Sequence, residues 1–175
     1  RNRAGARPEI FTYGHRDHLG LTVHPDTGAV FLAEHGPNGG DEINAIVSGR
    51  NYGWPTFTFG RDYQGPRLSE TPLGPGIEAP LVVWLPSIAP TGLTFYTGDR
   101  FPSWKGNLFV GSGRRGEVPR TGGLERVVLN AKMEELRRET LFSHVDELLE
   151  SVGMPGSLAE LGIARDEFAA ALPDL

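Results

Sequence analysis

The stretch that decides the fold of this chain is Tyr13-Gly14-His15-Arg16-Asp17-His18-Leu19-Gly20-Leu21, followed a strand later by Ala33-Glu34-His35-Gly36-Pro37-Asn38-Gly39-Gly40-Asp41-Glu42. Between them, residues 21–24 and 29–32 alternate or run apolar and flank the segment Pro25-Asp26-Thr27-Gly28. Proline at the first corner and a glycine that tolerates positive φ are typical of a turn between two strands. The sequence therefore predicts a hairpin that holds two loops, one with Arg16 and two imidazoles, the other with glycines and carboxylates.

Composition excludes several classes of protein. The 175 residues are 38% hydrophobic and carry a net charge of −5, which is typical of a globular domain with a core of its own. No basic stripe is present to neutralise phosphates, so we expect no nucleic-acid partner. No apolar run approaches the roughly 18–20 residues that span a bilayer, so we expect no membrane span. The absence of cysteine excludes disulfides, thiolate nucleophiles and zinc–sulfur sites, and leaves the compartment open.

Short apolar or alternating segments recur through the first three quarters of the chain, separated by turns rich in glycine and proline. Besides the hairpin, strands are expected at 9–13, 42–47, 57–59, 81–84, 93–96, 107–112 and 127–129. Residues 61–80 have little apolar periodicity and predict a long surface loop, a kind of loop that is often functional. Many short strands at regular spacing favour a sandwich, a barrel or a propeller.

The pattern changes after residue 129. Apolar residues then follow helical spacing, namely Met133, Leu136, Leu141, Val145, Leu148, Leu149 and Val152. Residues 153–156, Gly-Met-Pro-Gly, end such a helix, and residues 157–160, Ser-Leu-Ala-Glu, have the form of a capping box. We therefore expect a mostly β protein with two parts, a β unit over residues 1–129 and a short α-helical tail over residues 130–175.

Four stretches carry a family likeness: GHRDHLGL (14–21), AEHGPNGGDEIN (33–44), GRNYGWP (49–55) and WLPSIAPTGLTFYTGDRFPSWKGNLFVG (84–111). Through them, and more weakly through LERVVLN (124–130), residues from about 8 to 129 resemble the soluble aldose sugar dehydrogenases that depend on pyrroloquinoline quinone (PQQ), in the glucose/sorbosone dehydrogenase family. The resemblance implies a six-bladed β-propeller, of which about half of the blades would lie in this chain. It also implies PQQ and calcium at one end of the central channel, and a periplasmic or secreted location.

The resemblance assigns cofactor contacts to particular residues. Arg16 matches the arginine that pairs with PQQ, and a planar guanidinium suits carboxylates and quinone oxygens. Asp17 stands where the family has asparagine, and Leu19 stands where it has a glutamine that Leu19 cannot replace as a hydrogen-bond partner. Ser87 matches a hydroxyl residue near the cofactor, and Arg114 is aligned loosely with a basic PQQ contact.

The resemblance also assigns the metal and substrate contacts. Gly36 and Pro37 match a pair whose backbone carbonyls bind the calcium, an ion that prefers oxygen ligands. Trp84 stands where the family has an aromatic residue and is assigned to the substrate. The catalytic base of the family is a histidine well upstream of the GHR motif, so it is expected before Arg1 and none of the five histidines here is assigned to it. We therefore expect this chain to be inactive, or nearly so, by itself.

The implied reaction is the oxidation of an aldose sugar at C1 by hydride transfer to the quinone, with electrons passed on to an external acceptor. The main alternative is a non-catalytic, propeller-like binding or interaction module. A third reading follows residues from about 145 to 175, which resemble the helical domain of iron-dependent alcohol dehydrogenases but lack the metal and nucleotide sites of that family.

Several residues have simpler interpretations that compete with chemistry. His15 and His18 have the spacing of a metal-binding pair, but we favour loop histidines whose hydrogen bonds are made with the backbone. Asn38, Asp41 and Glu42 lack the spacing of an EF-hand, so a glycine-rich turn is favoured over an independent calcium loop. The alternating charges of residues 134–138 are interpreted as the solvated face of a helix.

Overall fold

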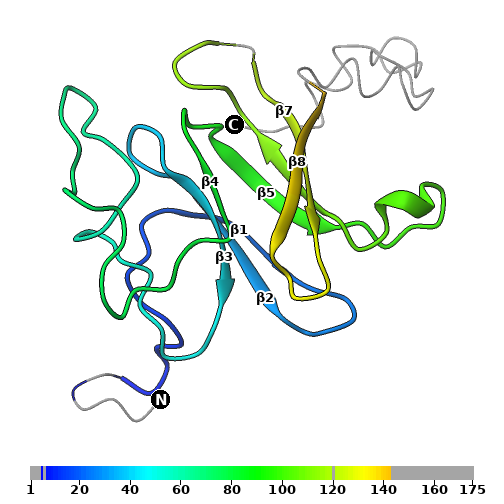
Figure 1. Cartoon of the computed structure of the whole chain (residues 1–175), viewed down its shortest axis with the longest axis horizontal. Coiled ribbons are helices and arrows are strands. Elements are labelled where there is room, and N and C mark those ends of the chain that lie inside the picture. The colour runs from blue at the N-terminus through cyan, green and yellow to red at the C-terminus, as the bar shows by residue number, and fades with distance from the viewer. Residues whose placement is uncertain (1–4, 6, 120, 143–175) are drawn as a thin grey trace, which may run out of the picture.

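The computed structural model describes residues 5, 7–119 and 121–142, and its strands form two four-stranded antiparallel sheets (Figure 1). The first sheet contains β1 (His18–Val23), β2 (Val30–Glu34), β3 (Asp41–Ile46) and β4 (Val82–Trp84), and the second contains β5 (Pro90–Phe95), β6 (Leu108–Ser112), β7 (Gly123–Leu129) and β8 (Glu135–Phe142). A short 3-10 turn, η1 (Pro102–Trp104), lies between β5 and β6. In both sheets the strands are adjacent in chain order, which is the arrangement of a propeller blade.

The number of sheets bears on the expected number of blades. The described residues contain two such sheets, whereas half of a six-bladed propeller would supply three. The total of six blades therefore stays a prediction. Within the described residues, no helix has the length and apolar character needed to cross a bilayer.

The predicted hairpin is confirmed as β1 and β2. Leu21 lies opposite Leu32 in the register of this pair, and Gly28 in the turn has a φ of 71°. His24 closes the turn, because its backbone N–H donates to the Ala29 carbonyl at 2.8 Å and its ring Nδ1 accepts two backbone N–H groups at 3.2 and 3.3 Å. The two loops that the hairpin holds are thereby placed at one end of the first sheet.

Both sheets contribute to one apolar core. Its buried members from the first sheet are Phe31, Ala33, Ile43, Val82 and Trp84, and those from the second part are Ile88, Phe95, Leu108, Val110 and Val127. The rings of Phe31 and Phe95 meet edge to face, with centroids 5.2 Å apart. Gly20 permits the close approach of β1 and β5, because a Cβ at this position would lie 2.8 Å from the Gly92 Cα.

The loop at 61–80 is irregular as predicted, but two of the expected strands are absent. Residues 9–13 and 57–59 lie outside the strands, as loop, turn and an isolated bridge at Tyr13. Their backbone groups bond elsewhere instead: the Tyr13 N–H donates to the Arg50 carbonyl of another loop, and the Phe57 N–H donates to the Gly53 carbonyl within its own turn.

The helix predicted from residue 130 is wrong over 135–142, where β8 pairs with β7 as an outer strand of the second sheet. The helical spacing did not mark a buried face, since Leu136 is 65% exposed. Asn130 forms the connecting turn, because its side-chain Oδ1 accepts the backbone N–H groups of Lys132 and Glu134 at 2.8 and 2.9 Å. The sheet thus continues past the expected boundary at 129/130, and the rest of the predicted tail, 143–175, lies outside the described residues.

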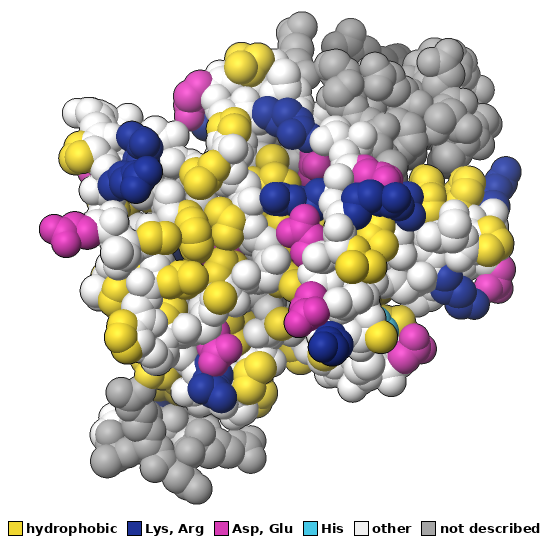
Figure 2. Space-filling model, viewed as in Figure 1, with side chains coloured by type: hydrophobic (Ala, Val, Ile, Leu, Met, Phe, Trp, Pro, Cys, Tyr) yellow, Lys and Arg dark blue, Asp and Glu magenta, His cyan; other side chains and the backbone are white. Residues whose placement is uncertain are grey.

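The charges of this segment belong to a strand and not to a helix face. Arg126 on β7 donates to Glu139 on β8 at 3.0 Å, and Arg137 and Arg138 pair with Glu139 and Glu135 at 2.8 Å each. Figure 2 shows acidic and basic side chains interspersed over the region of β7 and β8, while hydrophobic side chains gather over the other half of the same view.

Candidate functional site

Arg16 lies where three loops meet. Its guanidinium donates to the backbone carbonyl of His35 at 2.7 Å and to the Tyr63 hydroxyl at 3.3 Å, and it lies 5.4 Å from the centre of the Trp54 ring. The nearest carboxylate is that of Asp17, 4.0 Å away and 55% exposed. Neutral partners and a weak, exposed ion pair leave most of the positive charge of Arg16 available to an anionic ligand.

The loop that carries Arg16 is anchored by the buried Glu34 of β2. The Glu34 carboxylate accepts the Arg16 backbone N–H at 2.8 Å and the Asn44 amide at 2.8 Å, and it pairs with His15 Nδ1 at 2.7 Å. Burial acts to raise the pKa of Glu34, but the hydrogen bonds and the charge of His15 outweigh it, and the pKa lies below its ordinary value. An ionised Glu34 therefore holds the Arg16 loop in place.

His15 has partners on both ring nitrogens, but they are side chains and not the backbone groups that the simpler interpretation expected. Besides Glu34, its Nε2 lies 2.9 Å from the Thr12 hydroxyl, and its ring stacks on Tyr52 with centroids 4.6 Å apart. Ligand atoms of His15, His18 and Glu34 do lie within 4.8 Å of one another, so the geometry of a metal group is present, but His15 could ligate a metal only by giving up one of these contacts.

Glu42 is a second carboxylate in this cluster, and it is held in a different state. Burial, together with the negative charges of Glu34 and Asp41, raises the pKa of Glu42 to about 7, although a hydrogen bond from Asn44 opposes the shift. Asn44 donates to both Glu34 and Glu42, at 2.8 and 3.1 Å, and is fully buried. Glu42 is therefore protonated far more readily near neutral pH than an ordinary carboxyl group.

The fully buried Asp41 connects this end of the first sheet to the segment before β5. One carboxylate oxygen accepts the Gly36 backbone N–H at 2.9 Å and pairs with His35 Nδ1 at 2.7 Å. The other accepts the Ser87 hydroxyl and the backbone N–H groups of Ile88 and Ala89, all within 2.9 Å. A single carboxylate thus fixes the loop of Gly36 and Pro37 against the loop of Ser87.

Gly36 and Pro37 form a tight turn whose carbonyls are available to a cation. A Cβ on Gly36 would lie 2.6 Å from the Gly40 carbonyl carbon, so the turn requires glycine there. Among the described residues, no donor bonds to the carbonyl of Gly36 or of Pro37. Carbonyl oxygens without a protein donor fit the coordination preference of calcium, so these two residues could hold such an ion.

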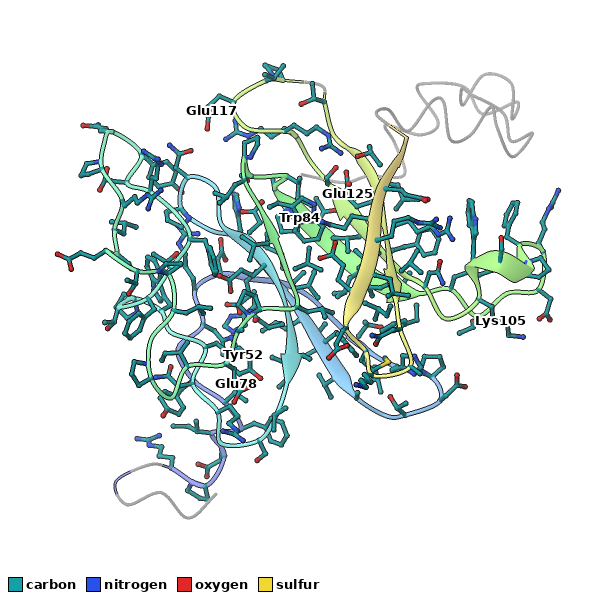
Figure 3. The ribbon with its side chains drawn as sticks, viewed as in Figure 1. Tyr52, Glu78, Trp84, Lys105, Glu117 and Glu125 are labelled. Atoms are coloured by element: carbon teal, nitrogen blue, oxygen red, sulfur yellow. The ribbon has the colours of Figure 1, made fainter. Side chains whose placement is uncertain are left out.

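The remaining predicted site residues are placed differently. Ser87 is 8% exposed, and its hydroxyl already donates to Asp41 and accepts the Ala89 N–H. Trp84 is 7% exposed in the core, with the Arg138 guanidinium 5.5 Å from its ring centre. Arg114 pairs at 3.4 Å with Glu117, and Figure 3 shows Glu117 on an outer loop near the top of the view, with Tyr52 lower in the molecule. A cofactor or substrate role for these three residues stays a prediction.

Sequence reasoning missed the participation of the loop at 61–80. Tyr63 of this loop bonds to Arg16, and Arg61 donates its backbone N–H to the Asn38 carbonyl at 3.2 Å. The unusual length of the loop was the available signal, but no spacing in the sequence indicates which of its residues reach Arg16.

Comparison with known proteins gives consistent matches. The Glucose / Sorbosone dehydrogenase family model matches residues 1–152. The aldose sugar dehydrogenase YliI of Escherichia coli is 44% identical over 111 residues, which are 62% of this chain and 30% of that protein. A glucose dehydrogenase crystal structure has a TM-score of 0.73 and 39% identity, covering 81% of this chain and 40% of its own. A PQQ-bound aldose sugar dehydrogenase of Streptomyces coelicolor has a TM-score of 0.53 and 25% identity, covering 77% and 33%.

The matches differ in how much of each protein they cover. The chain spans only 27% and 30% of the length of two curated relatives, and 40% or less of the two solved structures. The family match also extends to residue 152, into the segment at 145–175 that was likened to iron-dependent alcohol dehydrogenases, and none of these matches supports that likeness.

Proposed function

From the premise that this chain belongs to the glucose/sorbosone dehydrogenase family, we propose that it forms the cofactor-binding part of an enzyme that oxidises aldose sugars at C1 with PQQ as the hydride acceptor. One observation carries the proposal. The guanidinium of Arg16, whose one carboxylate partner among the described residues is the exposed Asp17 at 4.0 Å, donates to the carbonyl of His35. His35 directly precedes Gly36 and Pro37, whose carbonyls accept from no donor in the described part of the chain. An anion site beside a hard-cation site is what an anionic cofactor bound together with calcium requires.

The residues of this chain would bind and position the cofactor. Arg16 would pair with its anionic oxygens, while the Tyr63 hydroxyl and the Trp54 ring keep the guanidinium in place. The carbonyls of Gly36 and Pro37 would hold calcium, and Asp41 keeps their turn fixed through the Gly36 N–H. PQQ, when bound, supplies the two-electron acceptor for the hydride from the sugar C1. A positive charge fixed in advance by Arg16 would stabilise the negative charge that the reduction creates.

The proposal extends to the longer protein that such an enzyme requires. Leu19, Leu21 and Val23 alternate along β1 and are 38%, 64% and 51% exposed, so one face of this strand is an apolar row without a cover in the described residues. A neighbouring blade would cover such a row. We place the catalytic base outside this chain, and propose that the isolated chain binds the cofactor without oxidising sugar. An external electron acceptor and a periplasmic or secreted location complete the proposal.

The test is a thermal melt of the purified 175-residue chain with calcium, with and without PQQ. A ligand at a hundred times its Kd stabilises the folded state by about 2.7 kcal/mol, which for a chain of this size raises Tm by about 5–10 °C. We expect that rise for the unmodified chain and for Arg100→Gln, which changes an exposed arginine without an ion pair in the described residues. We expect its loss in Arg16→Gln and after chelation of calcium.

The outcomes separate the candidate functions. A cooperative melt that PQQ leaves unmoved would contradict cofactor binding. If a neutral sugar then raised Tm without PQQ, the chain would be a non-catalytic binding module. Sugar oxidation by the purified chain in the presence of PQQ would show that the base is not outside it.

A further inference from the structure

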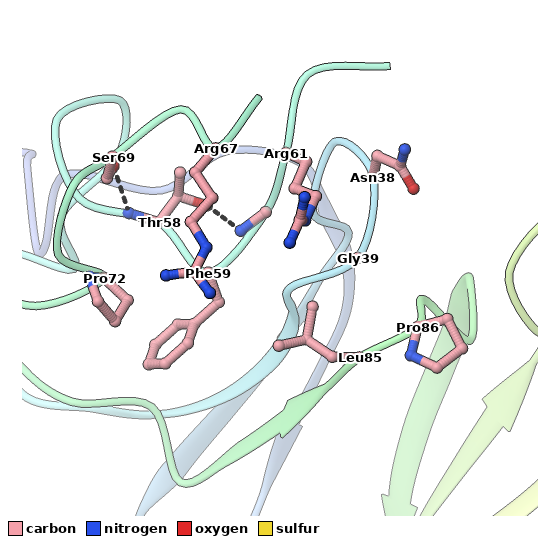
Figure 4. Close-up of a pocket in the computed structure, with 11 residues that line it drawn as sticks. Asn38, Gly39, Thr58, Phe59, Arg61, Arg67, Ser69, Pro72, Leu85 and Pro86 are labelled. Carbon is pink, nitrogen blue, oxygen red and sulfur yellow. Dashed lines mark hydrogen bonds between the residues drawn. The ribbon is translucent and has the colours of Figure 1, made fainter. Parts of the chain in front are cut away.

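A pocket of about 410 Å³ opens between the start of the loop at 61–80 and the segment after β4 (Figure 4). We call it the arginine pocket, and its principal lining residues are Arg61, Arg67, Phe59, Pro72, Leu85 and Pro86. Its volume falls within the range of about 300–1,000 Å³ that is typical of small-molecule sites. None of the residues assigned to the cofactor, the metal or the substrate lines it.

The two arginines, Arg61 and Arg67, have no acidic partner in the part of the chain that the structure describes. Arg61 and Arg67 lie opposite each other in an antiparallel bridge, which directs their side chains to one side. Figure 4 shows both guanidinium groups directed toward the space above Phe59 and Leu85. No acidic side chain lines the pocket, and neither arginine has a carboxylate partner among the described residues. Arginines of this chain that do have one are Arg16, Arg50, Arg114, Arg115, Arg126, Arg137 and Arg138.

Like charges directly opposite each other destabilise a strand pair. The arrangement occurs although the chain as a whole is acidic, with a net charge of −5. A bound oxyanion would relieve the repulsion, and a pair of guanidinium groups can offer several parallel N–H donors to one carboxylate or phosphate.

The rest of the lining defines what must accompany the anion. The hydroxyls of Thr58 and Ser69 are engaged within the protein, with the Gly60 N–H at 3.1 Å and with the Thr56 carbonyl at 2.8 Å (Figure 4 shows the first of these bonds). Below the guanidinium groups lie apolar side chains, of which Leu85 is 60% exposed. The complementary ligand therefore has one oxyanion and a compact body with an apolar face, as the C–H face of a sugar ring provides.

The arginine pocket adjoins the proposed cofactor site. Tyr63, which lies between the two arginines in the sequence, bonds to Arg16. Gly60, which lines the pocket, packs against the turn of Gly36 and Pro37, since a Cβ on Gly60 would lie 2.6 Å from the Pro37 Cδ. A ligand anchored by Arg61 and Arg67 would thus be held next to the turn of Gly36 and Pro37.

We propose that the arginine pocket binds the oxyanion of an acidic sugar, a carboxylate or a phosphate, and so selects charged sugars over neutral ones. The selection of a substrate rests on the proposed function, whereas the binding of the acidic sugar does not. The two ligand chemistries share the oxyanion, and separate probes distinguish them.

The experiment is calorimetric titration of the 175-residue chain, at low ionic strength, with galacturonate, with glucose 6-phosphate and with neutral galactose. We expect at least one acidic sugar to bind with a Kd at least tenfold below that of galactose, and to bind more weakly as salt is raised, because exposed charges are screened. Loss of a hydrogen-bonded charge pair is worth about tenfold or more. The double variant Arg61→Gln, Arg67→Gln should therefore lose the preference for the acid, while the control Arg100→Gln should keep it.

Three results would overturn the proposal: no binding of either acid, equal Kd values for acidic and neutral sugars, or a preference that survives the double variant. The PQQ melt of the double variant provides a further check. Its shift should be retained, and its loss would assign the pocket to the cofactor instead of to a sugar. Failure of the proposed function is a separate result, because it is read from the PQQ melt of the unmodified chain.

Discussion

Replacement of Asp41 by asparagine should lower the free energy of unfolding by about 3–5 kcal/mol. The carboxylate is fully buried and has five hydrogen-bond partners, two at one oxygen and three at the other. Two of these partners lie on the loop between β2 and β3 of the first sheet, and three lie on the segment that connects β4 of the first sheet to β5 of the second. The bonds therefore hold the connection between the two sheets against the first sheet. Loss of the carboxylate therefore acts on the whole fold.

The magnitude follows from the geometry of the substitution. An asparagine amide keeps one acceptor oxygen and places an NH2 group where the other stood. In the orientation that loses fewer bonds, that NH2 faces the ring of His35 and the backbone N–H of Gly36. In the unmodified protein, His35 Nδ1 and the Gly36 nitrogen lie 2.7 and 2.9 Å from the Asp41 carboxylate oxygen at this place. Each lost bond to a charged acceptor costs about 1.5–3 kcal/mol. The two losses sum to about 3–6 kcal/mol, and the cheaper burial of a neutral group offsets part of that sum.

The assay is urea unfolding of the full chain, followed by tryptophan fluorescence. Asp26→Asn, in the exposed turn between β1 and β2, is the matched control and should change stability by no more than about 0.5 kcal/mol. Ser87→Ala removes one of the five bonds and should cost about 1–2 kcal/mol, which keeps the series measurable if Asp41→Asn does not fold. An Asp41→Asn protein within about 1 kcal/mol of the unmodified chain would refute the reasoning.

Three further predictions concern other parts of the fold. The pKa of Glu42, about 7 in the folded protein against 4.5 when unfolded, means that stability falls as pH rises from about 4.5 through 7. Glu42→Gln should therefore leave the free energy of unfolding nearly unchanged in melts at pH 5 but raise it by about 2 kcal/mol at pH 8. The full pKa shift would allow an increase of at most about 3 kcal/mol. Equal effects of the substitution at both pH values would contradict the assignment. Gly20→Ala should destabilise by about 1–3 kcal/mol in urea, because its Cβ would lie 2.8 Å from the Gly92 Cα, and a neutral result would mean that β1 and β5 lie further apart. Arg126→Lys should cost about 2 kcal/mol, because an ammonium cannot bond to Glu139 and to the Asn107 amide oxygen at 2.7 Å as the guanidinium does; an unchanged unfolding midpoint would argue against β8 as the partner of β7.

The hairpin and its two loops could be predicted from the sequence because their determinants are local. Pro25 and Gly28 favour the turn, and alternation on either side of it favours strands, whatever the rest of the chain does. Arg16 and the pair of Gly36 and Pro37 could likewise be singled out, because each belongs to a short continuous motif. Their neighbours in space were not part of that prediction.

The tertiary structure alone decided the features that depend on residues far apart in the sequence. Residues 135–142 contain strong helix formers, yet the free edge of β7 satisfies their backbone groups as a strand, and local propensity is worth less than a row of such hydrogen bonds. Ser87 is engaged by Asp41, 46 residues away, and the arginine pocket exists because the loop at 61–80 folds back toward Leu85. Turn chemistry and alternation set local conformation, but which side chains meet depends on how the two sheets and their long loop pack together.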